Sequence, residues 1–258
     1  MIKTKQHKSL FILMTVVVIL FPILLFQKDI LNKERQHKGE TSFNTKTECT
    51  ETKSYYWKFW RNIVSDYYEG LLFVDVISAD RYMYGYKIDI IALHNKIVRL
   101  ELSAVDPTPF HDLYCNYHQR KQLSFCNKKL YWLLKQEFNH EFYAPLNESE
   151  LFNDRIVYGD NCGLAPIDPP ERIKIDRFVH KQSRDSLLKW LQSTNTEKQM
   201  YAVDGLLQLK QKGIALNSLE LKLIQKILSK KGTIYTCFGC IYNSDKIERI
   251  KESFKNID

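Results

Sequence analysis

Residues 82–102, with the sequence YMYGYKIDIIALHNKIVRLEL, carry the pattern that decides the fold of this chain. Apolar or aromatic side chains occupy every second position of residues 82–92 and again of residues 98–102, which is the period of a β-strand. The polar residues 94–96 between the two runs suit a tight turn. The stretch therefore predicts an antiparallel β-hairpin, and residues 71–78 are predicted to add a third strand.

The segment before this hairpin is predicted to be a helix. Across residues 53–69, aromatic side chains such as Trp57 and Trp60 recur at helical spacing, and Gly70 stands where a left-handed C-cap would end the helix. Aromatic residues beside Lys58 could stack on nucleic-acid bases. We favour the alternative, in which this aromatic face packs on the sheet.

The strand pattern is interrupted by prolines after the hairpin. Pro107 and Pro109 are predicted to stop the sheet, and helical spacing resumes from Asp112 until Pro145. Residues 159–163, which contain glycine and asparagine, then predict a loop that follows a short strand.

The C-terminal part contains the strongest local helix signals. Asp168 is predicted to cap a helix that begins with Pro-Pro-Glu, since these residue types are favoured at the first positions of helices. Asn195 is predicted to begin a later helix, and Asn217 another, in which Glu220 completes a capping box. Four helices joined by short loops predict antiparallel helical hairpins.

These patterns together predict an α+β fold with an N-terminal transmembrane helix, a small antiparallel sheet with helices, and a C-terminal helical-hairpin subdomain. The predicted segments are a short N-terminal tail (1–9), a transmembrane anchor (10–27), a polar linker (28–52), an α+β domain (53–165) and a helical-hairpin subdomain with a CxxC tail (166–258).

The predicted membrane anchor runs from Leu10 to Phe26. This stretch is uncharged and rich in Leu, Ile, Val and Phe, so it is more stable in lipid than in water. A helix of this length spans about 25 Å, and Lys8 and Lys28 can reach the headgroups of a slightly thicker bilayer. The alternatives are a cleaved signal peptide and a buried helix, but no small-x-small cleavage site follows the stretch. The very short N-terminal tail favours a cytoplasmic N-terminus, with the folded part outside the cytoplasm.

Composition narrows the classes of protein that the chain can belong to. Of its 258 residues, 44% are hydrophobic and 13% aromatic, which is ample for a buried core and excludes a disordered protein. The formal net charge is +8, but the basic residues are scattered, so no nucleic-acid partner is predicted. The sequence contains no phosphate-binding glycine loop and no catalytic signature that we can identify, so no catalytic residue is predicted.

The sharpest candidate site is the CxxC motif of Cys237 and Cys240. A β-like segment precedes the motif and a predicted helix over residues 246–254 follows it, an arrangement in which a helix N-terminus can make a dithiol redox-active. The alternatives are half of a zinc site, a structural disulfide, or plain thiols, because no second CxxC is present. The six cysteines of the chain are compatible with disulfides outside the cytoplasm.

A second candidate site consists of His111, Cys115 and His118. Their spacing would place three metal-binding side chains on one face of a helix. Zinc would need a fourth ligand, which Cys126 or Asp112 could supply. The alternative is a set of polar residues on a solvent-facing surface.

Two segments carry a resemblance to known proteins. Residues 187–191 followed by 202–209 resemble HEAT-like α-hairpin repeats. Residues 201–206, together with 237–240, are similar to uncharacterised membrane-anchored or exported bacterial proteins, a resemblance that implies no activity. The sequence thus predicts a membrane-anchored, extracytoplasmic protein that binds a protein partner or the envelope without catalysis. The alternative is a thiol-disulfide oxidoreductase or a metal-binding protein that uses the CxxC motif.

Overall fold

A computed structural model describes residues 52–77, 83–105, 119–163 and 167–254. All of them belong to one compact unit, Lys46–Asp258. The predicted anchor from Leu10 to Phe26 lies outside the described residues. No helix in the described part of the chain is both long and apolar enough to cross a bilayer.

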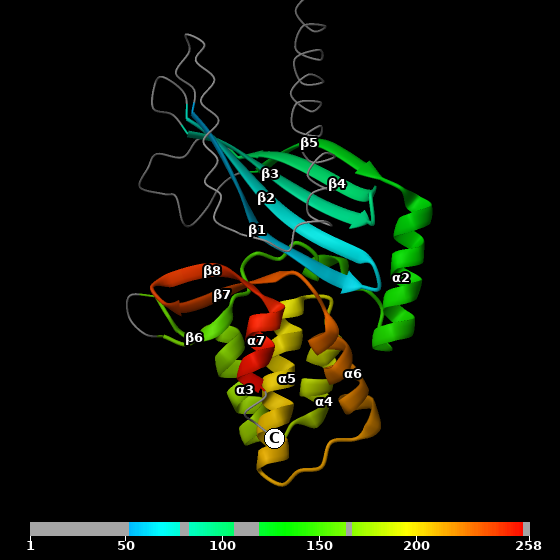
Figure 1. The fold of residues 1–258 in the computed structure, drawn as a ribbon, viewed down its shortest axis with the longest axis vertical. Helices are drawn as coiled ribbons and strands as arrows, with labels where there is room; N and C mark the ends of the chain where they lie inside the picture. The colour runs from blue at the N-terminus through cyan, green and yellow to red at the C-terminus, as the bar shows by residue number, and fades with distance from the viewer. Residues whose placement is uncertain (1–51, 78–82, 106–118, 164–166, 255–258) are drawn as a thin grey trace, which may run out of the picture. The chain divides into compact units, whose positions relative to one another are not determined.

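The first sheet contains five antiparallel strands in chain order (Figure 1). The strands are β1 (Thr52–Val64), β2 (Tyr67–Ile77), β3 (Met83–Leu93), β4 (Lys96–Val105) and β5 (Gln119–Cys126). The predicted hairpin is confirmed, since β3 pairs with β4 and Ile90 lies opposite Leu100. The predicted strand over residues 71–78 is confirmed in its main part as β2.

The predicted helix over residues 53–69 is wrong, because this segment forms β1 and the start of β2. Phe59 and Arg61 are buried on either side of the half-buried Trp60, as alternate residues of a strand are, and residues 61–64 are all buried. Register shifts between Trp57 and Phe59 and between Asn62 and Val64 each insert an extra residue into the ladder. The aromatic residues therefore fall three or four positions apart and imitate a helical period.

Gly70 is not a helix C-cap but a residue in the middle of β2, opposite Trp60. A Cβ at this position would lie 2.3 Å from the indole of Trp60 and 2.6 Å from that of Trp57. Glycine is needed here because the two indole rings, which pack edge to face at 5.3 Å, occupy the space above the strand.

The prediction that the sheet stops at Pro107 and Pro109 is also wrong. β4 ends at Val105, but residues 119–126, which we expected to be helical, form the fifth strand. The helix of this region begins only at Lys128. Every residue from 121 to 126 is exposed. The segment therefore lacks the alternation of apolar and polar residues by which a half-buried strand is recognised in a sequence.

Helices and a second sheet make up the rest of the described chain. They are α2 (Lys128–Phe142), η1 (Glu148–Glu150), β6 (Tyr158–Cys162), α3 (Pro170–His180), α4 (Arg184–Leu191), α5 (Thr196–Gln211), α6 (Ser218–Ser229), β7 (Thr233–Gly239), β8 (Ile241–Lys246) and α7 (Ile247–Phe254).

All three predicted helices begin where the sequence indicates, and two of the three predicted N-caps are confirmed. Asn195 caps α5, and Asn217 caps α6 with the reciprocal hydrogen bonds of a capping box to Glu220. Asp168 does not cap α3, which starts at Pro170 without a side-chain cap. Its carboxylate instead accepts a hydrogen bond from the backbone N–H of Asn161, at 3.0 Å.

The second sheet has the order β6-β7-β8, with β6 parallel to β7 and β8 antiparallel to it. The predicted loop over residues 159–163 is therefore wrong for residues 159–162, which belong to β6, while Gly163 follows the strand as a turn. A pairing with a strand some 75 residues later leaves no local signal in the sequence, and Gly159 interrupts the alternation of side chains in β6.

The two sheets meet where the chain leaves α6. The N–H of Asn62 donates to the carbonyl of Lys231 at 3.1 Å, and the N–H of Trp60 donates to the hydroxyl of Thr233, also at 3.1 Å. Gly232 lies between them at a φ of 103°, and a Cβ there would be 2.2 Å from the carbonyl oxygen of Trp60. This close approach lets the start of β7 lie along the outer edge of β1.

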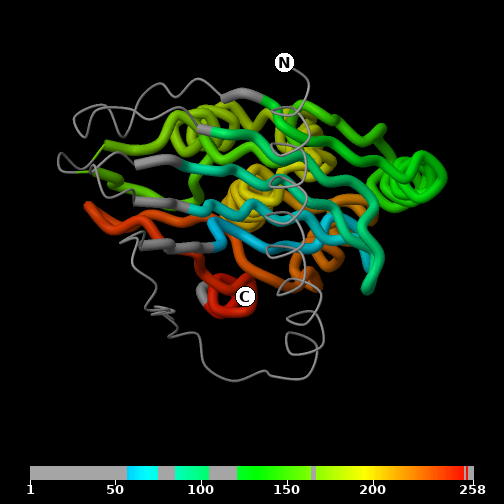
Figure 2. Tube along the Cα trace, turned by 90° about the horizontal axis from the view of Figure 1, so that it is seen from above, coloured from blue at the N-terminus to red at the C-terminus, as the bar shows by residue number. Residues whose placement is uncertain are grey.

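One hydrophobic cluster extends through both halves of the described chain. It includes Ile63 and Ile91 of the first sheet, Phe138 of α2, and Leu206 of α5. Figure 1 shows α3, α4, α5 and α6 grouped on one side of the first sheet, with the second sheet between. In the perpendicular view, α5 lies behind the strands of the first sheet (Figure 2).

A buried ionic cluster joins these layers. Arg61 of β1 donates through Nε to Glu69 of β2 at 2.7 Å and through Nη1 to Glu197 of α5. The side chains of all three are 1% exposed or less. Burial opposes the charge of Arg61, but the carboxylates of Glu197 and Glu69 outweigh it, so the pKa of the guanidinium is raised. The carboxylates also accept from the backbone N–H groups of Phe152 and Tyr235.

Replacing Arg61 should strongly destabilise the protein. Arg61→Ala leaves two buried carboxylates without their counter-charge, and the expected loss is about 3–5 kcal/mol of unfolding free energy. Urea denaturation of the full-length chain measures it. The matched control, Arg155→Ala at an exposed position, should leave the midpoint almost unchanged. Equal midpoints for the two variants would contradict this role of Arg61.

Candidate functional site

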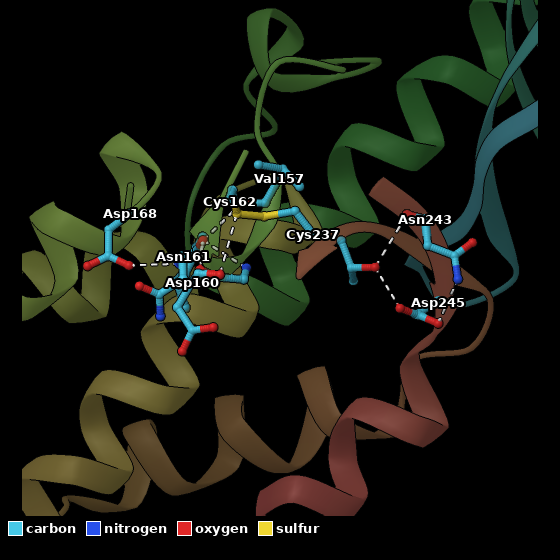
Figure 3. Close-up of a disulfide and its surroundings, with 11 residues drawn as sticks. Val157, Asp160, Asn161, Cys162, Asp168, Cys237, Asn243 and Asp245 are labelled. Atoms are coloured by element: carbon cyan, nitrogen blue, oxygen red, sulfur yellow. Dashed lines mark hydrogen bonds between the residues drawn. A yellow bond between two sulfur atoms is a disulfide. The ribbon is translucent and has the colours of Figure 1, made fainter. Parts of the chain in front are cut away.

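A disulfide between Cys162 and Cys237 joins β6 to β7, with Cα atoms 5.7 Å apart (Figure 3). Both residues are buried and pack against Val157. The bond links residues 75 positions apart, so the closed loop includes α3 to α6. Closing a loop of this length restricts the unfolded chain, and the expected stabilisation is about 4 kcal/mol.

Gly159 makes room for this disulfide. It lies opposite Cys237 in the parallel ladder, and its φ of 157° lies in a range that residues other than glycine rarely adopt. A Cβ at this position would be 2.2 Å from the carbonyl oxygen of Cys237 and 2.9 Å from its Sγ. A larger residue at position 159 would therefore push β6 away from β7.

Polar contacts hold the strands on both sides of the disulfide (Figure 3). Asp168 accepts from Asn161 on the β6 side, as described above. On the other side, the hydroxyl of Thr236 donates to the carboxylate of Asp245 at 2.6 Å. These groups bond to backbone or to each other rather than to a sulfur atom, so their contribution is to position the strands.

Cys240, the second cysteine of the predicted CxxC site, is a free thiol and is exposed. Phe238 pairs with Ile241, so Gly239 and Cys240 form a two-residue hairpin turn, with Gly239 at a φ of 55°. The predicted succession of strand, CxxC and helix is wrong, because β8 follows the motif and α7 begins only at Ile247. In the described part of the chain, the residue after Cys240 thus begins a strand and not a helix.

The same hairpin exposes large apolar side chains. Phe238 is 76% exposed, Ile241 68% and Tyr242 49%. Phe238 and Ile241 lie directly opposite each other across the turn, so their side chains share one face of the hairpin. Single exposed apolar residues are common, but adjacent ones on a projecting turn are typical of interaction sites.

The second predicted site cannot be placed, because His111, Cys115 and His118 lie outside the described residues. Within the described ranges, no group of three or more His, Cys, Asp or Glu side chains is arranged to hold a metal ion. Zinc binding stays a prediction from the sequence.

A buried lysine that no sequence pattern indicates lies beside the ionic cluster. Lys230 follows α6 and is 3% exposed, with Nζ 3.5 Å from the hydroxyl of Thr196 and 5.1 Å from the centre of the Phe142 ring. Burial, followed by the positive charge of Arg61, lowers the pKa of its amine to about 7. Its neighbour Lys231 is exposed, and nothing in the sequence distinguishes the two.

Lys230 borders a groove of about 270 Å³ between the turn of β1 and β2 and the ends of α2 and α6. The groove also contains Lys226, which forms an ion pair with Glu141, and Asn62, whose side chain bonds to backbone carbonyls. A lysine with a pKa near 7 can act as a nucleophile or a proton acceptor. Because Lys226 and Asn62 are already bonded to other groups, we identify no catalytic set among these residues.

Comparison of the chain with protein-family models, with curated proteins and with solved structures found no match. The resemblance to HEAT-like hairpins therefore stays a prediction.

The depressed pKa of Lys230 should appear in the pH dependence of stability. Between about pH 7 and 10 the unfolded chain holds a proton that the folded chain has lost, so the unfolding free energy rises with pH. From pH 7.5 to 9.0 we expect an increase of about 1–2 kcal/mol, measured by urea denaturation.

Lys230→Met should remove this increase, while Lys231→Met, at an exposed position, should retain it. If the unfolding free energy of the wild type rises with pH no more than that of Lys230→Met, the lowered pKa of Lys230 is contradicted.

Proposed function

We propose that this chain is a membrane-anchored, extracytoplasmic binding module that engages a protein partner through the tip of the β7–β8 hairpin and performs no catalysis. The observation that carries the proposal is the exposure of Phe238 and Ile241, which share one face of a hairpin that the disulfide at Cys237 fixes close to its turn. We refer to these two residues as the apolar tip.

The apolar tip can supply a useful share of binding energy. Burying a large apolar side chain contributes about 1.5–3 kcal/mol, so the two together contribute about 3–6 kcal/mol before the losses of association. This is too little for tight binding, which implies a wider interface around the tip. Because the disulfide holds Cys237 one residue before Phe238, little conformational freedom is lost when a partner binds.

The disulfide also supports the proposed compartment. Disulfides persist outside the cytoplasm and are rare within it. The Cys162–Cys237 bond therefore favours a folded part on the oxidising side of the membrane, with residues 10–27 as the anchor.

A thiol-disulfide oxidoreductase that uses Cys237 and Cys240 is the second candidate function. The exposed thiol of Cys240, three residues from a disulfide, favours it. In the structure, however, Cys237 is bonded to Cys162 rather than to Cys240, so the CxxC motif does not form a dithiol by itself. Binding at the apolar tip is therefore our leading proposal.

The compartment can be tested by fractionation and protease accessibility. We expect the full-length chain in the membrane fraction, extractable by detergent but not by alkaline carbonate, and degraded by protease added to spheroplasts. A cytoplasmic marker protein must stay intact in the same sample. Recovery of the uncleaved full-length chain in the soluble fraction would rule out the anchor.

Binding can be tested by placing a photo-cross-linking amino acid at position 238 of the full-length chain in intact cells. We expect discrete protein adducts that disappear when Ile241→Asp is added, because a buried charge disfavours an apolar interface. Leu221→Asp is the matched control, since Leu221 is 45% exposed on the distant helix α6. Adducts that survive Ile241→Asp, or that are lost equally with Leu221→Asp, would exclude the apolar tip as the binding surface.

A further inference from the structure

Three cysteines lie close together at the second sheet. Cys162 and Cys237 form the disulfide, and the residue that pairs with Cys162 in the parallel ladder is Gly239. Cys240 follows Gly239 directly, and the N–H of Gly163 donates a 2.8 Å hydrogen bond to the carbonyl of Gly239. Successive Cα atoms are about 3.8 Å apart and paired strands about 4.8 Å apart, so the Cα of Cys240 lies within about 9 Å of that of Cys162.

Open space lies beside the turn that carries Cys240. A Cβ added to Gly239 would find no atom within 4 Å, and the thiol of Cys240 is exposed. Disulfides need Cα atoms about 4.4–6.8 Å apart. Because Cys237 and Cys240 are separated by two residues, one of them glycine, a local change of the turn is sufficient to bring their sulfur atoms together.

We propose that Cys162, Cys237 and Cys240 form a thiol-disulfide exchange site. The thiolate of Cys240 attacks Sγ of Cys237, the Cys237–Cys240 bond forms, and the Cys162–Cys237 bond breaks. Cys162 leaves as a thiolate and takes up the proton that Cys240 released. One disulfide and one thiol are present before and after the step, so no oxidant or reductant is consumed.

The exchange changes what the disulfide holds together. In the described state it links β6 to β7 across 75 residues, whereas after the exchange it closes only the tip of the β7–β8 hairpin. The covalent restraint on the segment that contains α3 to α6 is then lost, and β6 is held by its backbone hydrogen bonds and packing. The remaining disulfide includes Cys240, next to Phe238, where a thiol of another protein can reach it.

Rapid alkylation of the purified full-length protein tests this site. The protein is equilibrated at pH 8 in detergent without reductant, alkylated with N-ethylmaleimide, and its cysteine linkages are mapped by peptide mass spectrometry. In most molecules we expect maleimide on Cys240 and a Cys162–Cys237 linkage. A minor share, about 1–10%, should carry maleimide on Cys162 together with a Cys237–Cys240 linkage.

Two variants set the comparison. Cys240→Ser removes the attacking thiol and defines the background of maleimide on Cys162, while Cys126→Ser removes the other exposed thiol of the described chain and should match the wild type. Wild-type labelling of Cys162 above the Cys240→Ser background supports the exchange, and labelling equal to that background overturns it. The assay uses purified protein, so its result is independent of whether the apolar tip binds a partner.

Discussion

The guanidinium of Arg61, buried between two carboxylates, is the contact on which the joining of the layers depends. It belongs to β1, and its partners Glu69 and Glu197 belong to β2 and α5. Removing three charges from water is unfavourable, so the cluster is not an efficient source of net stability. Its geometry is selective instead, because any other placement of α5 against the sheet would leave a charge buried without its counter-charge.

The same contact determines where the candidate site lies. Glu197 accepts a hydrogen bond from the backbone N–H of Tyr235 in β7, and Thr233 at the start of β7 accepts one from Trp60 in β1. The first residues of β7 are thus fixed to β1 and α5 before the strand reaches Cys237. The ionic cluster therefore fixes the start of the strand that carries Cys237 and leads to the apolar tip. Residues of β1 and α5, far from the hairpin in the sequence, in this way determine its position.

Sequence patterns predicted the features that depend on neighbouring residues. The β3–β4 hairpin and the caps at Asn195 and Asn217 are local, because strand alternation and capping hydrogen bonds involve residues a few positions apart. β1 was mistaken for a helix because its bulges change the spacing of its aromatic residues. The pairing of β6 with β7 and the choice of Cys162 as the partner of Cys237 depend on contacts across about 75 residues, which no local pattern encodes.

The exposed thiol of Cys240 connects the proposed binding with the proposed exchange. In an oxidising compartment a free, accessible thiol reacts with other disulfides. The thiol of Cys240 would stay free there only if it were covered, or it would take part in thiol-disulfide exchange. A partner that covers Phe238 and Ile241 would also cover Cys240, which lies between them in the turn. Binding would then hold the turn in its present form and keep the Cys162–Cys237 bond, whereas an uncovered tip would leave Cys240 able to attack. The state of the disulfide would in this way depend on whether the apolar tip is occupied.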